Sequence, residues 1–282
     1  MPKKAPVIET GEVVETVGKR VRVRVGDALR VLPFRGVQVV VGDRVGLSDG
    51  VVVSHEPRRT ILLRAGEIMD RLICANATLL ISVNASMDPP FRTGLVDRLL
   101  VTASIAGLDP AILLNKCDLG MPEHVLERMA YYEALEIPIF LVSATQQKGL
   151  ETLRERLKGE TAVFVGHSGV GKTSLMKALI PGIEREVGEL DAWGRGRHTT
   201  TSTALRDLPD GGRIIDIPGV REFGIGNLTR SELRQHFPEL APLRCKYHNC
   251  AHDRDDGCIA EDHCDAERLD SYRKLLSELE RS

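Results

Sequence analysis

A glycine-rich segment, G-H-S-G-V-G-K-T at residues 166–173, has the residue types and spacing of a phosphate-binding loop. It fits G-x-x-x-x-G-K-[S/T], in which glycines let backbone N–H groups point inward around phosphates. Lys172 can neutralise charge on the β- and γ-phosphates, and the Thr173 hydroxyl can bind Mg²⁺. An apolar run precedes the segment and a helical pattern follows it, which favours this loop over a chance glycine-rich turn. The expected nucleotide contacts here are Gly166, His167, Ser168, Gly169, Val170, Gly171, Lys172, Thr173 and Ser174.

A second motif, N-K-C-D at residues 115–118, directly follows another apolar run. The Asp118 carboxylate can accept hydrogen bonds from guanine N1–H and from the exocyclic amine, whereas adenine offers no such pair. Asn115 can join this loop to the phosphate-binding loop, and the stem of Lys116 can cover the base. Alone, so short a motif also fits a helix-capping turn. A serine–alanine turn after the apolar run 137–142 is of the type that contacts the base in GTPases. The expected base contacts are Asn115, Lys116, Cys117, Asp118, Ser143 and Ala144.

D-I-P-G at residues 216–219 fits the pattern D-x-x-G after a strand-like run. Asp216 would hold Mg²⁺ through a water molecule, and the Gly219 amide would sense the γ-phosphate. Between this motif and the phosphate loop lies G-R-G-R-H-T-T-T at residues 194–201, where a GTPase needs a threonine that closes on Mg²⁺. Spacing favours Thr201, then Thr200, although the segment also fits a flexible basic loop. The expected magnesium ligands are Thr173, Thr201 and Asp216.

Three cysteines and one histidine form a compact pattern, Cys245-x4-Cys250-x-His252-x5-Cys258. They supply the Cys₃His set of a structural zinc site. In a chain without an export signal, clustered cysteines favour a metal over disulfides, and one ion could stabilise a segment too small for its own core. Reduced, unliganded cysteines are the alternative. Cys264 could replace one ligand, which makes Cys258 the least certain of the sulfurs. Further spare candidates are His248 and His263.

The elements that must position these groups alternate between strand-like and helical patterns from about residue 66. Strands are predicted at residues 79–83, 111–114, 137–142, 162–165 and 214–217, with helices between them. This alternation predicts an α/β domain, a mostly parallel sheet with helices on both faces. The base-reading motifs precede the phosphate loop, whereas ordinary GTPases have the reverse order. A circularly permuted P-loop GTPase domain explains this order, because joining the old termini and cutting elsewhere preserves the site.

The first 65 residues carry 12 Lys/Arg and 7 Asp/Glu, a net charge of +5, whereas residues 66–227 and 228–282 carry −4 and −3. Residues 20–25 alternate arginine with valine, the period of a half-exposed strand. Several short strands separated by Gly/Asp turns predict a small OB-type β-barrel, with an SH3-like barrel or part of a sandwich as alternatives. The arginine-lined face could follow an RNA phosphate backbone, although solvated charge is the simpler explanation.

Composition agrees with a globular protein, because 42% of the residues are apolar and 28% are charged. The sequence has no run of the ~18 apolar residues that a membrane span needs, and its start lacks an apolar leader. We therefore expect a cytoplasmic protein without membrane contact, and a monomer. Three domains are predicted: an OB-like RNA-binding barrel at 1–65, the permuted G domain at 66–227, and a zinc-binding domain with a terminal helix at 228–282.

Taken together, the motifs resemble the RsgA (YjeQ/YloQ) family of small ribosomal subunit biogenesis GTPases. The resemblance spans the whole chain. It implies one structural Zn²⁺ and Mg²⁺ bound with GTP. It also implies GTP hydrolysis that the small (30S) subunit stimulates during late maturation, and contact with 16S rRNA. The residues that carry it are NKCD at 115–118, GHSGVGKTS at 166–174, GRGRHTTT at 194–201, DIPGVREFG at 216–224 and the cysteine pattern at 245–258.

Val220 occupies the place where Ras-like proteins have a water-orienting glutamine. We therefore predict slow hydrolysis by the protein alone, completed on a partner. His198 could supply the missing polar group, or it could be a solvated loop histidine or an RNA contact. The other residues predicted to act in catalysis are Lys172 and Thr201. Two further functions compete: a nucleotide-gated rRNA-binding module with incidental hydrolysis, and a metabolic P-loop kinase, against which the N-K-C-D motif argues.

Overall fold

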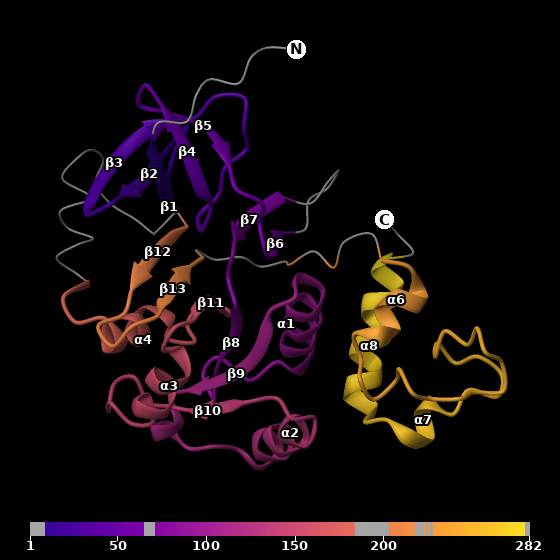
Figure 1. Cartoon of the computed structure of the whole chain (residues 1–282). Helices are drawn as coiled ribbons and strands as arrows, with labels where there is room; N and C mark the ends of the chain where they lie inside the picture. Colours follow the sequence, from indigo (N-terminus) through magenta and orange to yellow (C-terminus); the bar gives the residue numbers. More distant parts are fainter. Residues whose placement is uncertain are drawn as a thin grey trace.

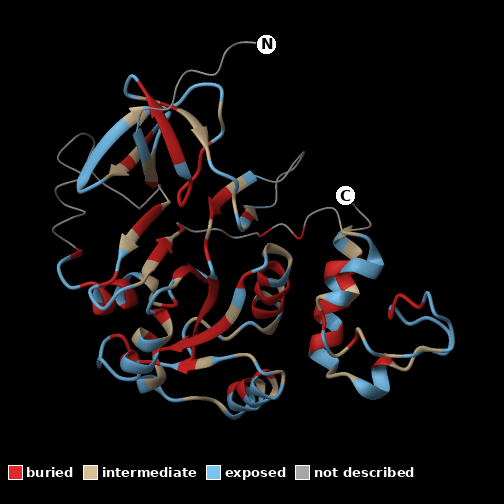
Figure 2. Ribbon diagram, in the orientation of Figure 1, coloured by how far each residue is buried: buried red, intermediate tan, exposed pale blue. Residues whose placement is uncertain are grey.

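The computed structural model describes residues 9–64, 71–183, 203–217, 223, 225 and 228–279. Figure 1 shows a β-rich N-terminal region above a mixed α/β region, with a group of helices at the C-terminal end. Figure 2 shows that burial is concentrated on the central strands and on the helix faces that meet them. Within the described ranges, no helix is both long and apolar enough to span a bilayer.

The N-terminal strands form a small closed barrel. They are β1 (Glu9–Val17), β2 (Arg20–Val25), β3 (Ala28–Pro33), β4 (Arg44–Ser48) and β5 (Val51–His55). β1 pairs antiparallel with both β2 and β4, β2 pairs with β3, and β4 pairs with β5. A bridge between Phe34 and Val52 closes the last gap, next to β3. Buried valines, Val13, Val23 and Val45 among them, fill the interior. This is the five-stranded OB-type architecture that the short strands and turns predicted.

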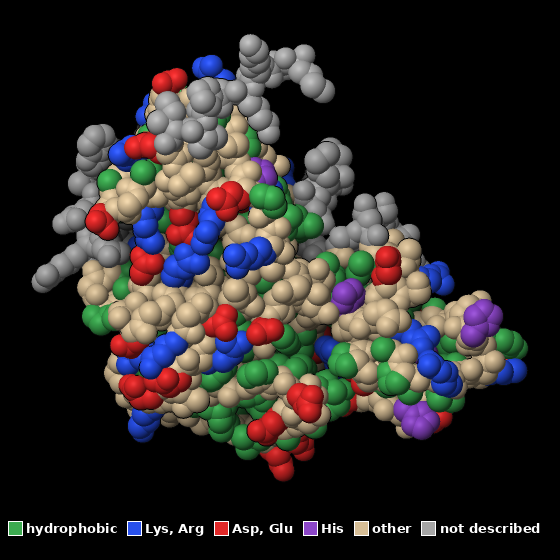
Figure 3. Space-filling model, viewed as in Figure 1, with side chains coloured by type: hydrophobic (Ala, Val, Ile, Leu, Met, Phe, Trp, Pro, Cys, Tyr) green, Lys and Arg blue, Asp and Glu red, His purple; other side chains and the backbone are tan. Residues whose placement is uncertain are grey.

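The arginines of β2 are engaged within the molecule. Arg22 forms an ion pair with Glu15 at 2.6 Å, and Arg24 reaches Asp207, outside the barrel, at 2.5 Å. Figure 3 likewise shows acidic and basic side chains interspersed over this region. These two arginines therefore meet carboxylates of the protein itself, and their contact with an RNA phosphate backbone stays a prediction. Alternation along one strand reveals which face is polar, but not which charges the neighbouring strand places opposite.

A hairpin connects the barrel to the α/β region and crosses the predicted boundary at residue 65. Its strands are β6 (Ile61–Arg64) and β7 (Arg71–Ala75), which pair antiparallel. The approach to the barrel is close, because a Cβ added to Gly42 would lie 2.0 Å from the carbonyl oxygen of Ala75. The Asn76 amide also donates to the carbonyl of Gly42 at 2.8 Å. The hairpin thus packs against the barrel as well as leading out of it.

The central sheet has the order β10-β9-β8-β11-β13-β12 and continues through β1 into the barrel. Its strands are β8 (Leu79–Ala85), β9 (Asp109–Asn115), β10 (Ile139–Leu141), β11 (Thr161–Val165), β12 (Ala204–Asp207) and β13 (Arg213–Asp216). All neighbours are parallel except β12, which runs antiparallel to β13 and pairs with β1 through Ala204 and Glu15. The mostly parallel sheet predicted from the sequence is confirmed.

Helices cover both faces of this sheet. Those described here are α1 (Thr93–Ala106), α2 (Glu123–Ala134), α3 (Leu150–Leu157) and α4 (Lys172–Leu179), with a short 3-10 turn η1 (Cys117–Leu119) after β9. Leu153 of α3 and Leu175 of α4 pack with Ile81 on one face, whereas Leu99 of α1 packs with Leu80 on the other. Adjacent residues of β8 therefore point into two separate cores, as strands buried on both faces require.

The C-terminal region comprises α6 (Arg230–Gln235), α7 (Ala260–His263) and α8 (Ala266–Leu279). Its core includes Phe237 and Tyr272, and Val101 of α1 belongs to the same cluster. Arg268 of α8 is 2% exposed and donates to Asp97 of α1 at 2.7 Å. Because an unpaired buried charge is costly, this ion pair ties the C-terminal region to α1 in one arrangement.

Candidate functional site

The phosphate-binding loop lies between the end of β11 and the start of α4, where parallel strands of this fold class place their ligands. Gly166 lies so close to β8 that an added Cβ would be 2.0 Å from the carbonyl oxygen of Val83. Gly171 has a φ of +93°, and a Cβ there would lie 2.3 Å from Nδ2 of Asn115. Both positions therefore require glycine, so the spacing that defines the motif reflects close packing as well as phosphate binding.

Lys172 begins α4 and turns back over the loop. Its Nζ donates to the carbonyls of Gly166 at 2.5 Å and His167 at 3.0 Å. Burial lowers the pKa of Lys172, and the nearby charge of Asp216 opposes this shift. Burial in turn raises the pKa of Asp216, opposed by Arg206 and Lys172. Lys172 of the phosphate loop and Asp216 of the D-x-x-G motif thus lie in one partly buried site. A positive group for a phosphate and a negative group for a divalent cation are both present there.

Asn115 joins the two loops that the sequence assigned to base and phosphates. It is 2% exposed at the end of β9. Its Nδ2 donates to the carbonyl of Val170 in the phosphate loop at 2.9 Å, and its Oδ1 accepts from the N–H of Ala144 at 3.1 Å. One side chain therefore fixes the N-K-C-D loop, the serine–alanine turn and the phosphate loop relative to one another.

The base-reading loop continues through a tight turn. Lys116 adopts the left-handed conformation, with φ 62° and ψ 29°, and η1 follows it. Asp118 is exposed within this turn, where its carboxylate can meet a base. Cys117 turns inward, because its backbone N–H donates to Val142 at 3.1 Å and its Sγ donates to Leu114. Ser143 is buried, and its hydroxyl accepts from the N–H of Gln146 at 3.2 Å, which shapes the second turn.

Several predicted residues lie outside the described residues. They are the switch residues His198, Thr200 and Thr201, together with Gly219 and Val220. Thr173 and Ser174 are exposed in the first turn of α4, beside the loop. Of the three expected magnesium ligands, Thr173 and Asp216 are therefore described, and both belong to elements that border the phosphate loop.

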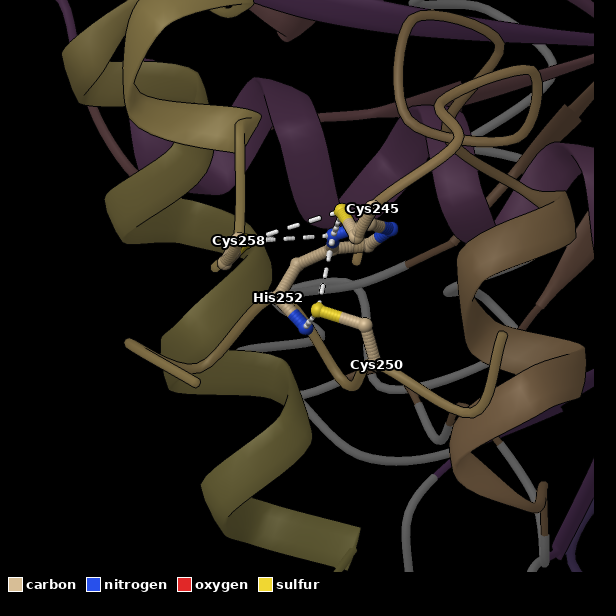
Figure 4. Close-up of side chains that lie close together, drawn as sticks. All are labelled: Cys245, Cys250, His252 and Cys258. Atoms are coloured by element: carbon tan, nitrogen blue, oxygen red, sulfur yellow. Dashed lines mark hydrogen bonds between the residues drawn. The ribbon is translucent and has the colours of Figure 1, made fainter. Parts of the chain in front are cut away.

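The four residues predicted as zinc ligands lie together beside α8 (Figure 4). Cys245, Cys250, His252 and Cys258 place their ligand atoms within 4.8 Å of one another, and they are the metal-ligand cluster found within the described ranges. Nδ1 of His252 lies 3.5, 3.6 and 3.5 Å from the sulfurs of Cys245, Cys250 and Cys258. Cys264 lies apart, with its Sγ directed at the carbonyl of Glu239, so Cys258 completes the cluster.

The spacing of this cluster fits a tetrahedral zinc ion. Zinc–sulfur bonds of ~2.3 Å and zinc–nitrogen bonds of ~2.0–2.1 Å at tetrahedral angles give sulfur–nitrogen separations of roughly 3.5–3.6 Å. The distances from His252 Nδ1 agree with this geometry. Its other ring nitrogen, Nε2, is buried with no hydrogen-bond partner among the described residues. The residues present can therefore hold Zn²⁺ in a closed, structural site.

The chain is similar to proteins of one known family. A family model described as RsgA GTPase matches residues 55–226. The chain belongs to the RsgA GTPase family. Relatives named small ribosomal subunit biogenesis GTPase RsgA include one from Ectopseudomonas mendocina (39% identical; 86% of this chain and 75% of the relative). Another, from Chlorobaculum parvum, is 36% identical over 97% of this chain and 94% of the relative.

Solved structures agree with this family. YjeQ from Thermotoga maritima matches with a TM-score of 0.75 and 27% identity, over 97% of this chain and 99% of that chain. YloQ, described as a circularly permuted GTPase, shares the fold with a TM-score of 0.70 and 23% identity, over 100% and 98%. As a member of the RsgA GTPase family, the chain is a GTP hydrolase, and its permuted motif order is confirmed at the level of the fold.

Two supporting residues of the site escaped the sequence motifs. Ser86, at the turn after β8, donates its hydroxyl to the carbonyl of Lys116 at 2.8 Å. Asp255 accepts from the backbone N–H groups of Ala251 at 3.0 Å and Asp253 at 3.2 Å, so it orders the zinc loop. Neither position belongs to a ligand pattern of the RsgA GTPase family that the sequence displays. Only their positions in the sequence could have pointed to them: Ser86 directly follows a predicted strand, and Asp255 lies between two of the predicted zinc ligands.

Proposed function

We propose that this protein binds the small (30S) ribosomal subunit, assists its late maturation, hydrolyses GTP to GDP and phosphate with stimulation by the subunit, and then dissociates. The observation that carries the proposal is the Asn115 bridge, which unites a guanine-reading loop with a phosphate loop in one site. Membership of the RsgA GTPase family and the printed names of its relatives supply the ribosomal role.

Each group has a role that follows from its chemistry. Asp118 reads the guanine edge, and Lys172 neutralises charge that develops on the β- and γ-phosphates. Thr173, Thr201 and Asp216 would hold Mg²⁺, which supplies positive charge to the same phosphates when bound. The chain itself orients the nucleotide, because Asn115 holds the base-reading loop and the phosphate loop at a fixed distance from each other.

We propose that the catalytic site is incomplete without a partner, so that the protein alone hydrolyses GTP slowly. Val220 cannot orient the attacking water, so a polar group must come from elsewhere. His198 is the candidate within this chain, and the small subunit is the candidate for placing it. A His198→Ala protein that hydrolyses GTP normally on the subunit would exclude this role for His198.

The contact with 16S rRNA is proposed to involve the barrel and the zinc-binding region. Zn²⁺ would be held by Cys245, Cys250, His252 and Cys258, which the tetrahedral spacing supports. The domain limits 1–65, 66–227 and 228–282 stay a proposal, as do the monomeric state and the cytoplasmic location.

The test is GTP turnover with and without purified 30S particles, together with sedimentation in GDP or a non-hydrolysable GTP analogue. We expect co-sedimentation with 30S in the analogue, release in GDP, and stimulation that approaches the ~10³-fold a completed transition-state site supplies. Large 50S subunits serve as the matched control. Binding to 50S alone would overturn the partner, and binding without stimulation would favour a nucleotide-gated rRNA-binding module instead.

A further inference from the structure

The loop that follows β8, residues 86–89, packs against the base-reading loop without belonging to any nucleotide motif. Ser86 is 1% exposed. Its backbone N–H donates to the carbonyl of Asn115 at 3.0 Å, and its hydroxyl donates to the carbonyl of Lys116 at 2.8 Å. One buried serine thus holds the backbone of two consecutive residues of the N-K-C-D motif.

The carbonyl of Lys116 lies at the point where the base-reading loop turns. A residue with a Cβ is disfavoured in the left-handed conformation that Lys116 adopts. The same carbonyl also accepts from the N–H of Leu119 at 3.0 Å, which closes η1. Asp118 lies inside this turn, so the direction of its carboxylate depends on how firmly the carbonyl of Lys116 is held. The Ser86 hydroxyl is the contact that holds it from outside the turn.

Two further contacts fix the loop at residues 86–89 against the site. Nζ of Lys116 donates to the carbonyl of Asp88 at 2.6 Å. The stem of Lys116 also passes the phosphate loop, because a Cβ added to Gly171 would lie 3.9 Å from Cε of Lys116. At the far end of the turn, a Cβ on Gly120 would lie 3.7 Å from Sδ of Met87. The loop therefore supports the base-reading turn at its start and at its end.

We propose that Ser86 is a positioning residue for guanine recognition: its hydroxyl holds the left-handed turn at Lys116 and so directs Asp118 toward the base. This inference rests on the proposed function, because it takes the site to bind a guanine nucleotide. Without the hydroxyl, the carbonyl of Lys116 loses a buried donor and the turn is free to relax. The side-chain hydrogen bond of Ser86 goes to the base-reading loop rather than to the phosphate loop, so the effect concerns the base.

The experiment compares equilibrium binding of GDP and ADP to Ser86→Ala, with Ser82→Ala as the matched control. Ser82 lies on β8, just before the loop that carries Ser86; it is fully buried and accepts from the Asn84 amide at 3.0 Å rather than contacting the turn. We expect Ser86→Ala to bind GDP about tenfold more weakly, as the loss of a buried hydrogen bond predicts, with ADP binding unchanged. The GDP-to-ADP preference should therefore fall in this variant and stay constant in Ser82→Ala.

Two further variants separate positioning from folding. Ser86→Cys has a similar side-chain volume but a weaker donor, so its preference for GDP over ADP should also fall. Ser86→Thr keeps the hydroxyl donor and should show the same preference as the unsubstituted protein. Equal loss of GDP and ADP binding, or an unchanged preference in both Ser86→Ala and Ser86→Cys, would overturn the inference. If the unsubstituted protein shows no preference for GDP over ADP, the proposed function itself fails, which is a distinguishable result.

Discussion

At the scale of single residues, the nucleotide site depends on close contacts that residue types alone do not reveal. The sequence predicted Asn115 as a link between two loops, and the structure places its amide 2.9 Å from the carbonyl of Val170. The same amide explains why residue 171 must be glycine, because any side chain there would meet Nδ2. The motif could be predicted from its spacing, whereas the tight contact behind it depends on how the end of β9 packs against the phosphate loop.

Gly171→Ala tests this contact. The added Cβ would lie 2.3 Å from Nδ2 of Asn115, in a backbone conformation that disfavours any Cβ, so the bridge between the loops should break. We expect GTP affinity to fall at least tenfold, measured by equilibrium titration with a fluorescent analogue.

The control for this variant is Gly182→Ala. Gly182 has a comparable φ of +83°, but a Cβ there would meet nothing within 4 Å. It should cost about 1 kcal/mol of stability through the backbone alone and leave GTP affinity intact. Equal loss of affinity in both variants would show that strain, rather than contact with Asn115, limits the site.

At the scale of elements, the sequence predicted the strands and helices that carry apolar periodicity. The helix at 150–157 has the predicted bounds, and the strand expected at 162–165 is observed as β11. The hairpin β6–β7 and the strand β12 were missed, because each strand has only four or five residues and so shows little periodicity. The ion-pair partners of Arg22 and Arg24 could not be predicted from the alternation along one strand, since Glu15 and Asp207 come from other strands.

The cysteine cluster gives a prediction about one short segment. Cys250→Ser should remove zinc, because an alcohol is a poor substitute for a thiolate ligand, and metal content measured by mass spectrometry should fall from one equivalent toward zero. Cys264→Ser should retain one equivalent, since its sulfur lies outside the cluster. If Cys264→Ser lost zinc and Cys258→Ser kept it, Cys264 rather than Cys258 would be the zinc ligand, and the prediction would be wrong.

At the scale of the whole molecule, three regions are joined by polar contacts as well as by apolar cores. Asp265, just before α8, receives both Nη1 and Nη2 of Arg128 in α2, at 2.6 and 2.9 Å. Arg268 meets Asp97 in the same interface, and Arg98 donates to the carbonyl of Phe223 at 3.2 Å. These contacts fix the C-terminal region against α1 and α2, next to the segment that follows the D-x-x-G motif.

The contact between Arg128 and Asp265 predicts a dependence of stability on pH. The Arg128 guanidinium holds the pKa of Asp265 below its usual range. This stabilisation is therefore fully present above the ordinary carboxyl pKa of ~3.9 and is lost as pH falls through the lower folded value. Arg128→Met should cost about 1–2 kcal/mol near neutral pH, and the difference from the unsubstituted protein should shrink below about pH 4.

The measurement is denaturant unfolding of both proteins across this range of pH. Lys158→Met is the control, because its partner Glu155 is exposed and the pair contributes little to stability. A difference for Arg128→Met that persists unchanged at low pH would show that packing of the arginine stem, rather than its charge, stabilises the interface.

The pairing of β1 with β12 has a consequence for biosynthesis. Glu15 emerges from the ribosome well before its partner Ala204, which follows about 190 residues later, roughly 10–40 s at the usual rates of elongation. During that interval, the first strand of the nascent barrel has an unpaired edge, a feature that exposes a growing chain to misassociation. A charged residue, Glu15, stands at the point where this edge later pairs with Ala204, and a charge on an open edge disfavours pairing with another chain.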